Sequence, residues 1–275
     1  VCSSDLKNIE RIPFKNSLSD NVVSCIVEDR QKNLWIGTND GGLNLYNPEN
    51  RHFIHYALQE NQREEGFGSN NIKSVYVDDA RGLVYIGAHA GGLSILHRNS
   101  GRIENFNQRN SRLVNENVYS ILPDKDNTFL LGTLSALVHF NPEQRSFTTI
   151  SRESNGTPVT FQKITTLFRD SQKRLWVGSE EGISVFRQHG TEIERIPLLP
   201  ASTITKSFTN YIYEAANGLI WVGTREGAYC FNEKDKQIKR YTTANGLPNN
   251  VVYGILEDSY GRLWMSTNQG ISRFN

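Results

Sequence analysis

The chain has little cysteine, no excess of charge of one sign and no long apolar segment. Cysteine occurs at three of 275 positions, Cys2, Cys25 and Cys230, and no C-x-x-C pair is present, so we expect neither a disulfide scaffold nor a zinc site. Thirty basic residues stand against 29 acidic ones, and without a basic tract we expect no nucleic-acid binding by this segment. The apolar runs are only as long as strands, so the sequence predicts no membrane span.

Motifs for catalysis are missing as well. No G-x-S-x-G elbow and no phosphate-binding loop occur. Apart from the local pair His52 and His55, the six histidines show no metal-ligand spacing. Adjacent acids such as Glu180 and Glu181 are typical of solvated loops and do not mark the carboxylate pair of a glycosidase. We therefore expect no enzyme activity, no catalytic residue, no metal site and no cofactor in this segment.

What the sequence does contain is one short phrase that returns six times. It reads Leu-Trp-Ile-Gly-Thr at residues 34–38, and its equivalents stand at residues 84–88, 129–133, 175–179, 220–224 and 263–267. Counted from Gly37, the steps between copies are 50, 45, 46, 45 and 43 residues. A period of this length indicates a repeat architecture.

Each repeat reads as four short strands. In the first repeat, residues 22–29 are β-branched and apolar, 34–38 are the recurring phrase, 43–46 alternate apolar and polar residues, and 53–56 form a fourth run. Glycine, asparagine and proline between these runs supply tight turns. Four short antiparallel strands per repeat are typical of a β-propeller blade.

The sequence therefore predicts an all-β fold, a β-propeller of four-stranded antiparallel blades that forms one domain over residues 1–275. The six blades are expected at residues 17–56, 71–106, 117–150, 163–197, 210–242 and 250–275. The last repeat holds only three strands, and residues 9–14 form an orphan strand that could complete it and leave no open sheet edge. The alternative is that the chain is an excerpt from a larger propeller array.

Three residue types recur at fixed positions, and we expect them to be structural. An aspartate stands six residues before the aromatic of the phrase and can accept hydrogen bonds from amides of the turn. The aromatic is a large apolar body for packing between blades, and the glycine two residues later indicates close approach of another group. These residues are Asp29, Asp79, Asp124, Asp170 and Asp258; Trp35, Tyr85, Trp176, Trp221 and Trp264; and Gly37, Gly87, Gly132, Gly178 and Gly223. The fifth repeat has Ala215 in place of aspartate, and the last has Ser266 in place of glycine.

The turns between second and third strands differ from blade to blade, as expected of recognition loops on a common scaffold. Together with the loops that lead into the first strands they form what we call the loop face. Candidate ligand-binding residues on it are Asn39, Asp40, Phe67, His89, Phe161, Glu181, Arg225, Asn268 and Gln269. Phe67 and Phe161 are included as exposed aromatics that would suit a sugar ring, whereas Phe208 has the register of a rim packing residue. The alternative for the turn residues is that they are solvated polar tips.

The repeats resemble those of the two-component regulator propeller family, in which an aspartate and a glycine-containing turn precede Leu-Trp-Ile-Gly-Thr, two variable residues and Gly-Leu. Residues 34–43, 221–227 and 257–264 follow this pattern closely, and the phrase at residues 245–251 matches the segment between repeats. The third copy departs most, with Leu130 in place of the aromatic. The similarity covers nearly the whole chain.

This resemblance implies the periplasmic sensor region of a Bacteroides-type hybrid two-component regulator. In such proteins the propellers precede a membrane span, a histidine kinase and often a DNA-binding regulator, and many members sense oligosaccharides. An oligosaccharide ligand and a homodimer in the full-length sensor are expected by this kinship, with membrane contact only through a downstream span. The family commonly has propellers of seven blades, so six copies imply a fragment of a sensor.

Two alternatives to ligand sensing remain at this point. One is a structural or protein-interaction propeller that mediates dimerisation through its loop face. The other is a propeller enzyme such as a lyase or glycosidase, because such enzymes assemble their sites from distant blades.

Overall fold

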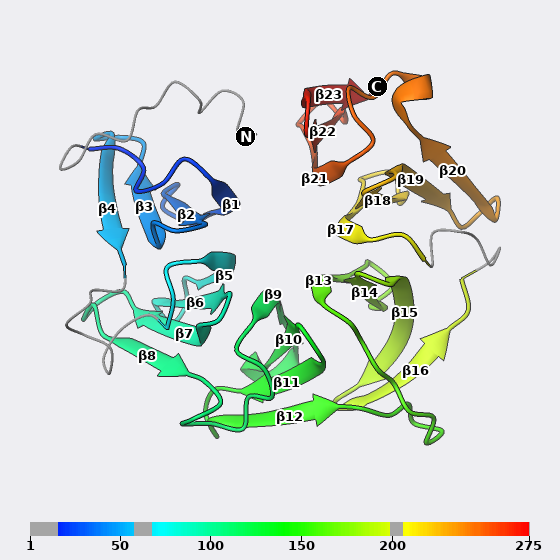
Figure 1. The fold of residues 1–275 in the computed structure, drawn as a ribbon. Helices are drawn as coiled ribbons and strands as arrows, with labels where there is room; N and C mark the ends of the chain where they lie inside the picture. The colour runs from blue at the N-terminus through cyan, green and yellow to red at the C-terminus, as the bar shows by residue number, and fades with distance from the viewer. Residues whose placement is uncertain (1–15, 58–67, 199–205, 275) are drawn as a thin grey trace. The chain divides into compact units, whose positions relative to one another are not determined.

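The repeats fold into small antiparallel sheets. The computed structural model describes residues 16–57, 68–198 and 206–274, and within them 23 strands form six sheets (Figure 1). Five sheets have four strands that pair in chain order, and the sixth has three within the described residues. The predicted fold class, an all-β propeller of six antiparallel blades, is confirmed. The predicted strand at residues 9–14 lies outside the described residues.

The first three blades follow one another along the chain. The first blade holds β1 (Val23–Glu28), β2 (Leu34–Thr38), β3 (Leu43–Asn47) and β4 (His52–Tyr56). The second holds β5 (Ile72–Asp78), β6 (Leu83–Ala88), β7 (Gly92–His97) and β8 (Ile103–Phe106). The third holds β9 (Val118–Pro123), β10 (Phe129–Thr133), β11 (Leu137–Asn141) and β12 (Ser146–Ile150), with a short 3-10 turn η2 (Lys125–Asn127).

The last three blades repeat the scheme. The fourth blade holds β13 (Ile164–Arg169), β14 (Leu175–Ser179), β15 (Gly182–His189) and β16 (Glu192–Ile196). The fifth holds β17 (Thr209–Glu214), β18 (Ile220–Thr224), β19 (Gly227–Asn232) and β20 (Gln237–Tyr241). After a second 3-10 turn, η4 (Thr243–Asn245), the sixth holds β21 (Val252–Glu257), β22 (Leu263–Thr267) and β23 (Gly270–Phe274).

The described residues fall into two compact units. The first comprises residues 16–57, 68–134 and 138–149, and the second comprises residues 135–137, 150–198 and 206–274. The first unit therefore holds the first three blades apart from the ends of β11 and β12, and the second holds the other three. No helix among the described residues is long and apolar enough to cross a bilayer.

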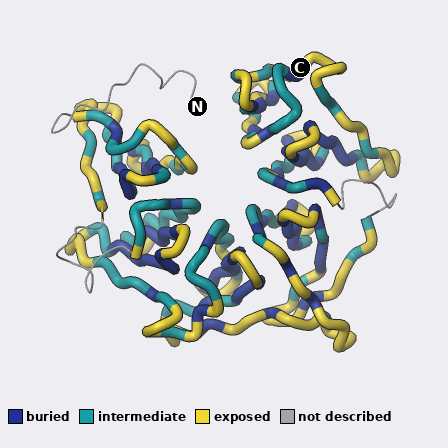
Figure 2. Tube along the Cα trace, viewed as in Figure 1, coloured by how far each residue is buried: buried dark blue, intermediate teal, exposed yellow. Residues whose placement is uncertain are grey.

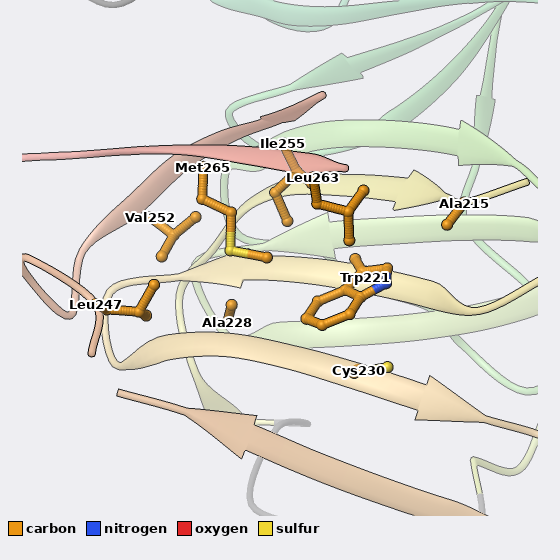
Figure 3. Packing of buried hydrophobic residues seen from close by; sticks show 9 residues of the cluster. All are labelled: Ala215, Trp221, Ala228, Cys230, Leu247, Val252, Ile255, Leu263 and Met265. Atoms are coloured by element: carbon orange, nitrogen blue, oxygen red, sulfur yellow. The ribbon is translucent and has the colours of Figure 1, made fainter. Parts of the chain in front are cut away.

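Within each unit the core lies between successive blades. Burial is greatest in the second and third strands, while the turns are exposed (Figure 2). In the first unit Trp35 and Leu43 of the first blade join Ile72, Val84 and Ile86 of the second in one buried cluster. In the second unit, Trp176 packs against the fifth blade in the same way. Figure 3 shows the next interface, where Trp221 and Ala228 lie beside Val252, Leu263 and Met265 of the sixth blade.

The recurring glycine lies where the first strand of the next blade approaches most closely. A Cβ atom added to Gly37 would stand 2.8 Å from Cγ2 of Ile72, and one on Gly178 would stand 2.6 Å from Cγ2 of Thr209. Both distances are shorter than van der Waals contact, so a side chain there would push two blades apart. Hence the glycine recurs because of blade-to-blade packing.

In the first, fourth and sixth blades the recurring aspartate ties its turn to the tryptophan of the phrase. Asp170 accepts hydrogen bonds from the backbone amide of Arg174 (2.8 Å) and from Nε1 of Trp176 (2.7 Å), and it pairs with the Arg174 guanidinium. Asp29 holds Trp35 similarly, at 3.2 Å. Burial alone would raise the pKa of Asp29, but the hydrogen bonds from Asn33 and Trp35 and the charge of Arg98 outweigh it and lower that pKa. We call this arrangement the aspartate clasp.

The fifth blade has the same turn without the clasp. Ala215 replaces the aspartate, and Nε1 of Trp221 is buried with no hydrogen-bond partner among the described residues. The backbone of the turn is nonetheless kept, because the Ala215 amide still donates to the carbonyl of Leu219 at 2.9 Å. The side chain of Asn217 accepts the Leu219 amide at 3.0 Å. Asn217 therefore replaces the aspartate as acceptor of the turn amide, whereas the hydrogen bond to the tryptophan indole is lost.

The sixth blade departs from the expectation that every aromatic of the phrase is interior. Trp264 has a complete clasp, with its Nε1 2.8 Å from Asp258, yet its side chain is 37% exposed. On the same sheet face, Leu256 is 62% exposed and Ile271 is 38% exposed. The tryptophans at the same position in the first, fourth and fifth blades, Trp35, Trp176 and Trp221, are at most 2% exposed, so this face of the sixth blade is covered less than theirs. We call these three side chains the end face.

Candidate functional site

The structure places most predicted ligand-binding residues at the exposed turns between second and third strands. Asp40, His89, Glu181 and Arg225 are exposed there, and so are Asn268 and Gln269, while Asn39 is half-buried. The backbone of these turns is fixed by a hydroxyl at the end of the second strand. Ser179 Oγ accepts the Glu181 amide and Thr267 Oγ1 accepts the Gln269 amide, both at 3.2 Å. Neither Glu181 nor Gln269 has a recorded side-chain partner within the described residues.

Beside each of these turns, the first strand of a blade carries a β-bulge. The register between first and second strands shifts at the same point in all six blades, so the register skips one residue of each first strand. A bulge re-aims the side chain of the extra residue. The bulge residues are Ser24, Lys73 and Tyr119 in the first unit, and Thr165, Asn210 and Tyr253 in the second.

Three bulge residues are short and tie one blade to the next. Ser24 Oγ donates to the carbonyl of Ile72 at 2.6 Å, and Asn210 Nδ2 donates to the carbonyl of Val252 at 2.9 Å. Thr165 Oγ1 bonds the carbonyl of Thr209. Each acceptor carbonyl belongs to the first residue of the next blade's first strand, so these hydrogen bonds hold successive blades together.

The other three bulge residues are long and reach the variable turns. Lys73 Nζ donates to Asn39 Oδ1 at 2.8 Å, and Tyr253 donates its hydroxyl to Asn268 Oδ1 at 2.8 Å. The hydroxyl of Tyr119 lies 3.4 Å from Nδ1 of His89, with the two rings 6.3 Å apart. Each pair holds a hydrogen-bonding group beside a ring or an alkyl stem, and such a combination can bind a polar ligand that has an apolar face.

The second unit has a further aromatic platform on its loop face. The guanidinium of Arg225 stands 3.8 Å from the centre of the Phe208 ring, and Lys163 Nζ stands 5.4 Å from it. Phe208 is half-buried. Phe208 is therefore a packing residue, as its register predicts. It also supports the predicted site residue Arg225, which its register does not predict.

Phe161, the other predicted aromatic that lies within the described residues, does not form such a platform. Phe161 is 7% exposed and its ring packs edge-on against Phe186, 6.0 Å away, so the expectation of an exposed stacking ring at this position is wrong. Phe67 lies outside the described residues. The loop that carries Phe161 folds back on itself, with Arg152 bridged to Pro158 and the Val159 amide donating to the carbonyl of Ser151.

Sequence reasoning missed the bulge residues, although a signal was present. At the second position of each first strand the residues are serine, lysine, tyrosine, threonine, asparagine and tyrosine, a variable set inside an otherwise repetitive strand. In the first strand of the first blade, burial raises the pKa of the Cys25 thiol to about 11, so this cysteine is protonated at neutral pH. Among the described residues no group of His, Cys, Asp and Glu side chains gathers as metal ligands do.

Comparison with known proteins identifies the repeat. Three segments, residues 17–40, 158–181 and 246–269, match the family model described as two component regulator propeller. Each matched segment runs through the first strand, the turn and the second strand to the loop-face turn. The three matched segments therefore include the aspartate clasps of the first, fourth and sixth blades.

One curated relative and two solved structures are similar over most of the chain. Histidine kinase P4 of Formosa agariphila is 30% identical over 265 residues, which is 94% of this chain and 19% of that protein. The chain thus spans about a fifth of the length of that relative. The extracellular domain of a putative hybrid two component system from B. thetaiotaomicron has a TM-score of 0.76 at 23% identity, over 94% of this chain and 34% of that one.

The second solved structure is PorZ of Porphyromonas gingivalis, described as an essential bacterial surface component of the type-IX secretion system. It has a TM-score of 0.73 at 18% identity, over 96% of this chain and 40% of that one. At such identities these two likenesses establish the fold and nothing finer.

Proposed function

The chain is built from two-component regulator propeller repeats, and from that premise we propose that it is part of the ligand-sensing region of a two-component signalling protein. The propeller lies in the periplasm and binds an oligosaccharide on its loop face. Its signal passes to a histidine kinase across a membrane span elsewhere in the parent protein. The similarity to a histidine kinase and to an extracellular sensor domain supports this proposal.

The observation that carries the ligand assignment is the contact between long bulge residues and variable turns. Lys73 with Asn39, Tyr119 with His89 and Tyr253 with Asn268 combine hydrogen-bonding groups with rings or alkyl stems. The same type of turn in the fifth blade places a guanidinium over an aromatic ring. A sugar presents hydroxyls to the polar groups and C–H faces to the rings, so its chemistry matches these pairs.

Thermal unfolding of the protein against a panel of neutral oligosaccharides tests this proposal, because a ligand that binds the folded state raises Tm. We expect at least one oligosaccharide to raise Tm. Lys73→Ala reduces that shift if the first unit binds the ligand, and Arg225→Ala reduces it if the second unit does. Lys32→Ala and Arg187→Ala are matched controls, because both side chains are exposed and lie away from the loop-face turns. If no oligosaccharide stabilises the protein, or the control variants reduce the shift equally, the ligand assignment is wrong.

The proposed effect of the ligand on the histidine kinase has to be tested in the full-length parent protein. A ligand can change kinase output only if it favours one arrangement of the two copies in a homodimer. We expect an oligosaccharide that stabilises the propeller to change autophosphorylation of the full-length sensor in membranes. An unchanged rate in the presence of a bound ligand would contradict the signalling role while leaving the binding site intact.

A second candidate function, dimerisation through the propeller itself, is favoured by the end face. Leu256, Trp264 and Ile271 are apolar side chains that solvate poorly when exposed. A second copy of the chain that covered them would bury this surface. Sedimentation of the protein and of Leu256→Glu separates the two candidates: a dimer that the substitution dissociates favours this role, and a monomer in both excludes it for the isolated chain.

A further inference from the structure

A basic hollow lies in the first unit between the end of the second blade and the start of the fourth strand of the third. Its volume is about 450 Å³, and it is lined by Arg109, Asn110, Ser111, Arg112, Arg145, Ser146 and Phe147. This volume is within the roughly 300–1,000 Å³ usual for small-molecule sites. None of the predicted ligand-binding residues within the described part of the chain lines it, so the hollow is separate from the loop-face contacts.

Two of its three arginines have no acidic partner. Arg109 and Arg112 are exposed, and no ion pair of either guanidinium is found within the described residues. Arg145 pairs with Glu104, and that carboxylate is also shared with Arg102 at 3.4 Å. Cations therefore outnumber the carboxylate that reaches them, and an oxyanion in the hollow would meet guanidinium groups that are not already neutralised.

The backbone that presents the two free arginines is fixed in advance. Asn107 Oδ1 accepts the amides of Arg109 and Asn110 at 2.9 and 3.2 Å, and Asn110 Nδ2 donates to the carbonyl of Asn105 at 2.8 Å. Ser111 Oγ donates to the carbonyl of Asn107 at 2.6 Å. The turn therefore loses little backbone freedom when a ligand binds, which favours affinity.

The opposite wall is equally firm. Phe147 is buried and stacks on Phe140, with ring centres 4.5 Å apart, and it also contacts Phe106 of the second blade. Ser146 and Ser111 add neutral oxygens to the lining. Arginines for an oxyanion together with hydroxyls for other hydroxyls match a polyhydroxyl ligand that carries acidic groups.

We propose that this hollow is a binding site for an anionic saccharide, whose sulfate or carboxylate groups are held by Arg109 and Arg112 with Arg145 beside them. The site goes beyond the loop-face function and does not depend on it. It would hold a charged part of a longer chain, or a separate acidic sugar, at the outer side of the second and third blades.

Titration calorimetry at low salt with the whole chain tests the site. The probes are a sulfated uronate-containing tetrasaccharide, its desulfated form that keeps the carboxylates, a neutral tetrasaccharide and an acidic hexapeptide. We expect one or both acidic sugars to bind, and the desulfated form then tells whether sulfate or carboxylate is recognised. Absence of binding by both acidic sugars overturns the proposal, and so does equally tight binding of the neutral sugar or of the peptide.

The decisive variants remove the two free cations. R109Q/R112Q is expected to weaken binding of the acidic sugar by roughly tenfold or more, as loss of two charge-assisted contacts implies. The control R187Q/K234Q removes the same charge from exposed side chains of the second unit and is expected to change binding by less than about twofold. Equal weakening by both pairs would mean general charge attraction and overturn the site. The Arg109 and Arg112 side chains make no ion pair with any other described residue, so we expect the variants to keep the fold, which circular dichroism checks.

Discussion

The fourth and fifth blades share one turn and differ in the residue that begins it. Lys173 and Gly218 occupy the same left-handed position, with φ of 64° and 81°, and both turns close with the same amide-to-carbonyl bonds. In the fourth blade Asp170 binds the Trp176 indole, whereas in the fifth Ala215 leaves the Trp221 indole unpaired. The shape of the turn therefore does not require the aspartate. What the aspartate adds is a partner for a buried N–H group.

The comparison also shows how the blades are joined. In both, the residue after the clasp position donates its amide to a carboxylate at the end of the next first strand. The Ser171 amide lies 2.6 Å from Glu214, and the Ala216 amide lies 2.8 Å from Glu257. This link is kept where the clasp is lost, so the joint between blades and the clasp within a blade are separate devices.

The largest effect is expected from removing the clasp of the fourth blade. Asp170→Ala leaves the Trp176 indole and the Arg174 guanidinium without their buried acceptor, and we expect a loss of about 3 kcal/mol in the free energy of unfolding. Urea unfolding measures it, with Glu192→Ala, an exposed acid on β16, as the control. If Asp170→Ala lowers the free energy of unfolding no more than the control does, the clasp does not stabilise the blade, and the alanine of the fifth blade costs no stability.

A smaller gain is expected from giving the fifth blade what it lacks. Ala215→Asp together with Leu219→Arg supplies both the acceptor for Trp221 Nε1 and the cation that Arg174 provides in the fourth blade. We expect the double variant to gain about 1 kcal/mol. Ala215→Asp alone is expected to gain less, because the carboxylate would be buried without a counter-charge. Denaturant unfolding of four proteins, the unaltered one, the two single variants and the double variant, gives the coupling, and strict additivity of the two changes would contradict it.

The smallest effect concerns acid. The folded pKa of Asp29 is lowered, so its ionised form favours the folded state. Its contribution is complete above about pH 4, where an unfolded aspartate ionises, and is lost as the pH falls through the lower folded value. We expect the stability of the unaltered protein to fall more steeply below about pH 4 than that of Asp29→Asn, and Ala215→Asn in the fifth blade to leave the slope unchanged. Parallel slopes for Asp29→Asn and the unaltered protein would sink this prediction.

The repetitive part of this fold can be predicted from the sequence, because the same residue types recur at the same positions in nearly every blade. Turn aspartate, strand aromatic and close-packed glycine lie within nine residues of one another, as in Asp29, Trp35 and Gly37. Their contacts are either local or to the next copy of the same pattern. The six sheets and the exposed positions of His89 and Arg225 agree with this periodicity.

The features that could not be read depend on register and on distant neighbours. A bulge exists only relative to the partner strand, so nothing in the sequence around Lys73 or Tyr253 states that the strand register shifts there. Phe161 is buried by Phe186, which comes 25 residues later, and Arg145 meets the turn of Arg109 from another blade. The exposure of Trp264 likewise depends on whether another surface packs against the sixth blade, and its own repeat does not encode that.

The uneven burial of the four tryptophans gives this protein a natural optical sensor. Trp35, Trp176 and Trp221 are buried and will emit at short wavelength with little access for a dissolved quencher, whereas Trp264 is the indole that iodide or acrylamide can reach. A blue shift of the quenchable emission would therefore report, without any label, when another surface covers Trp264.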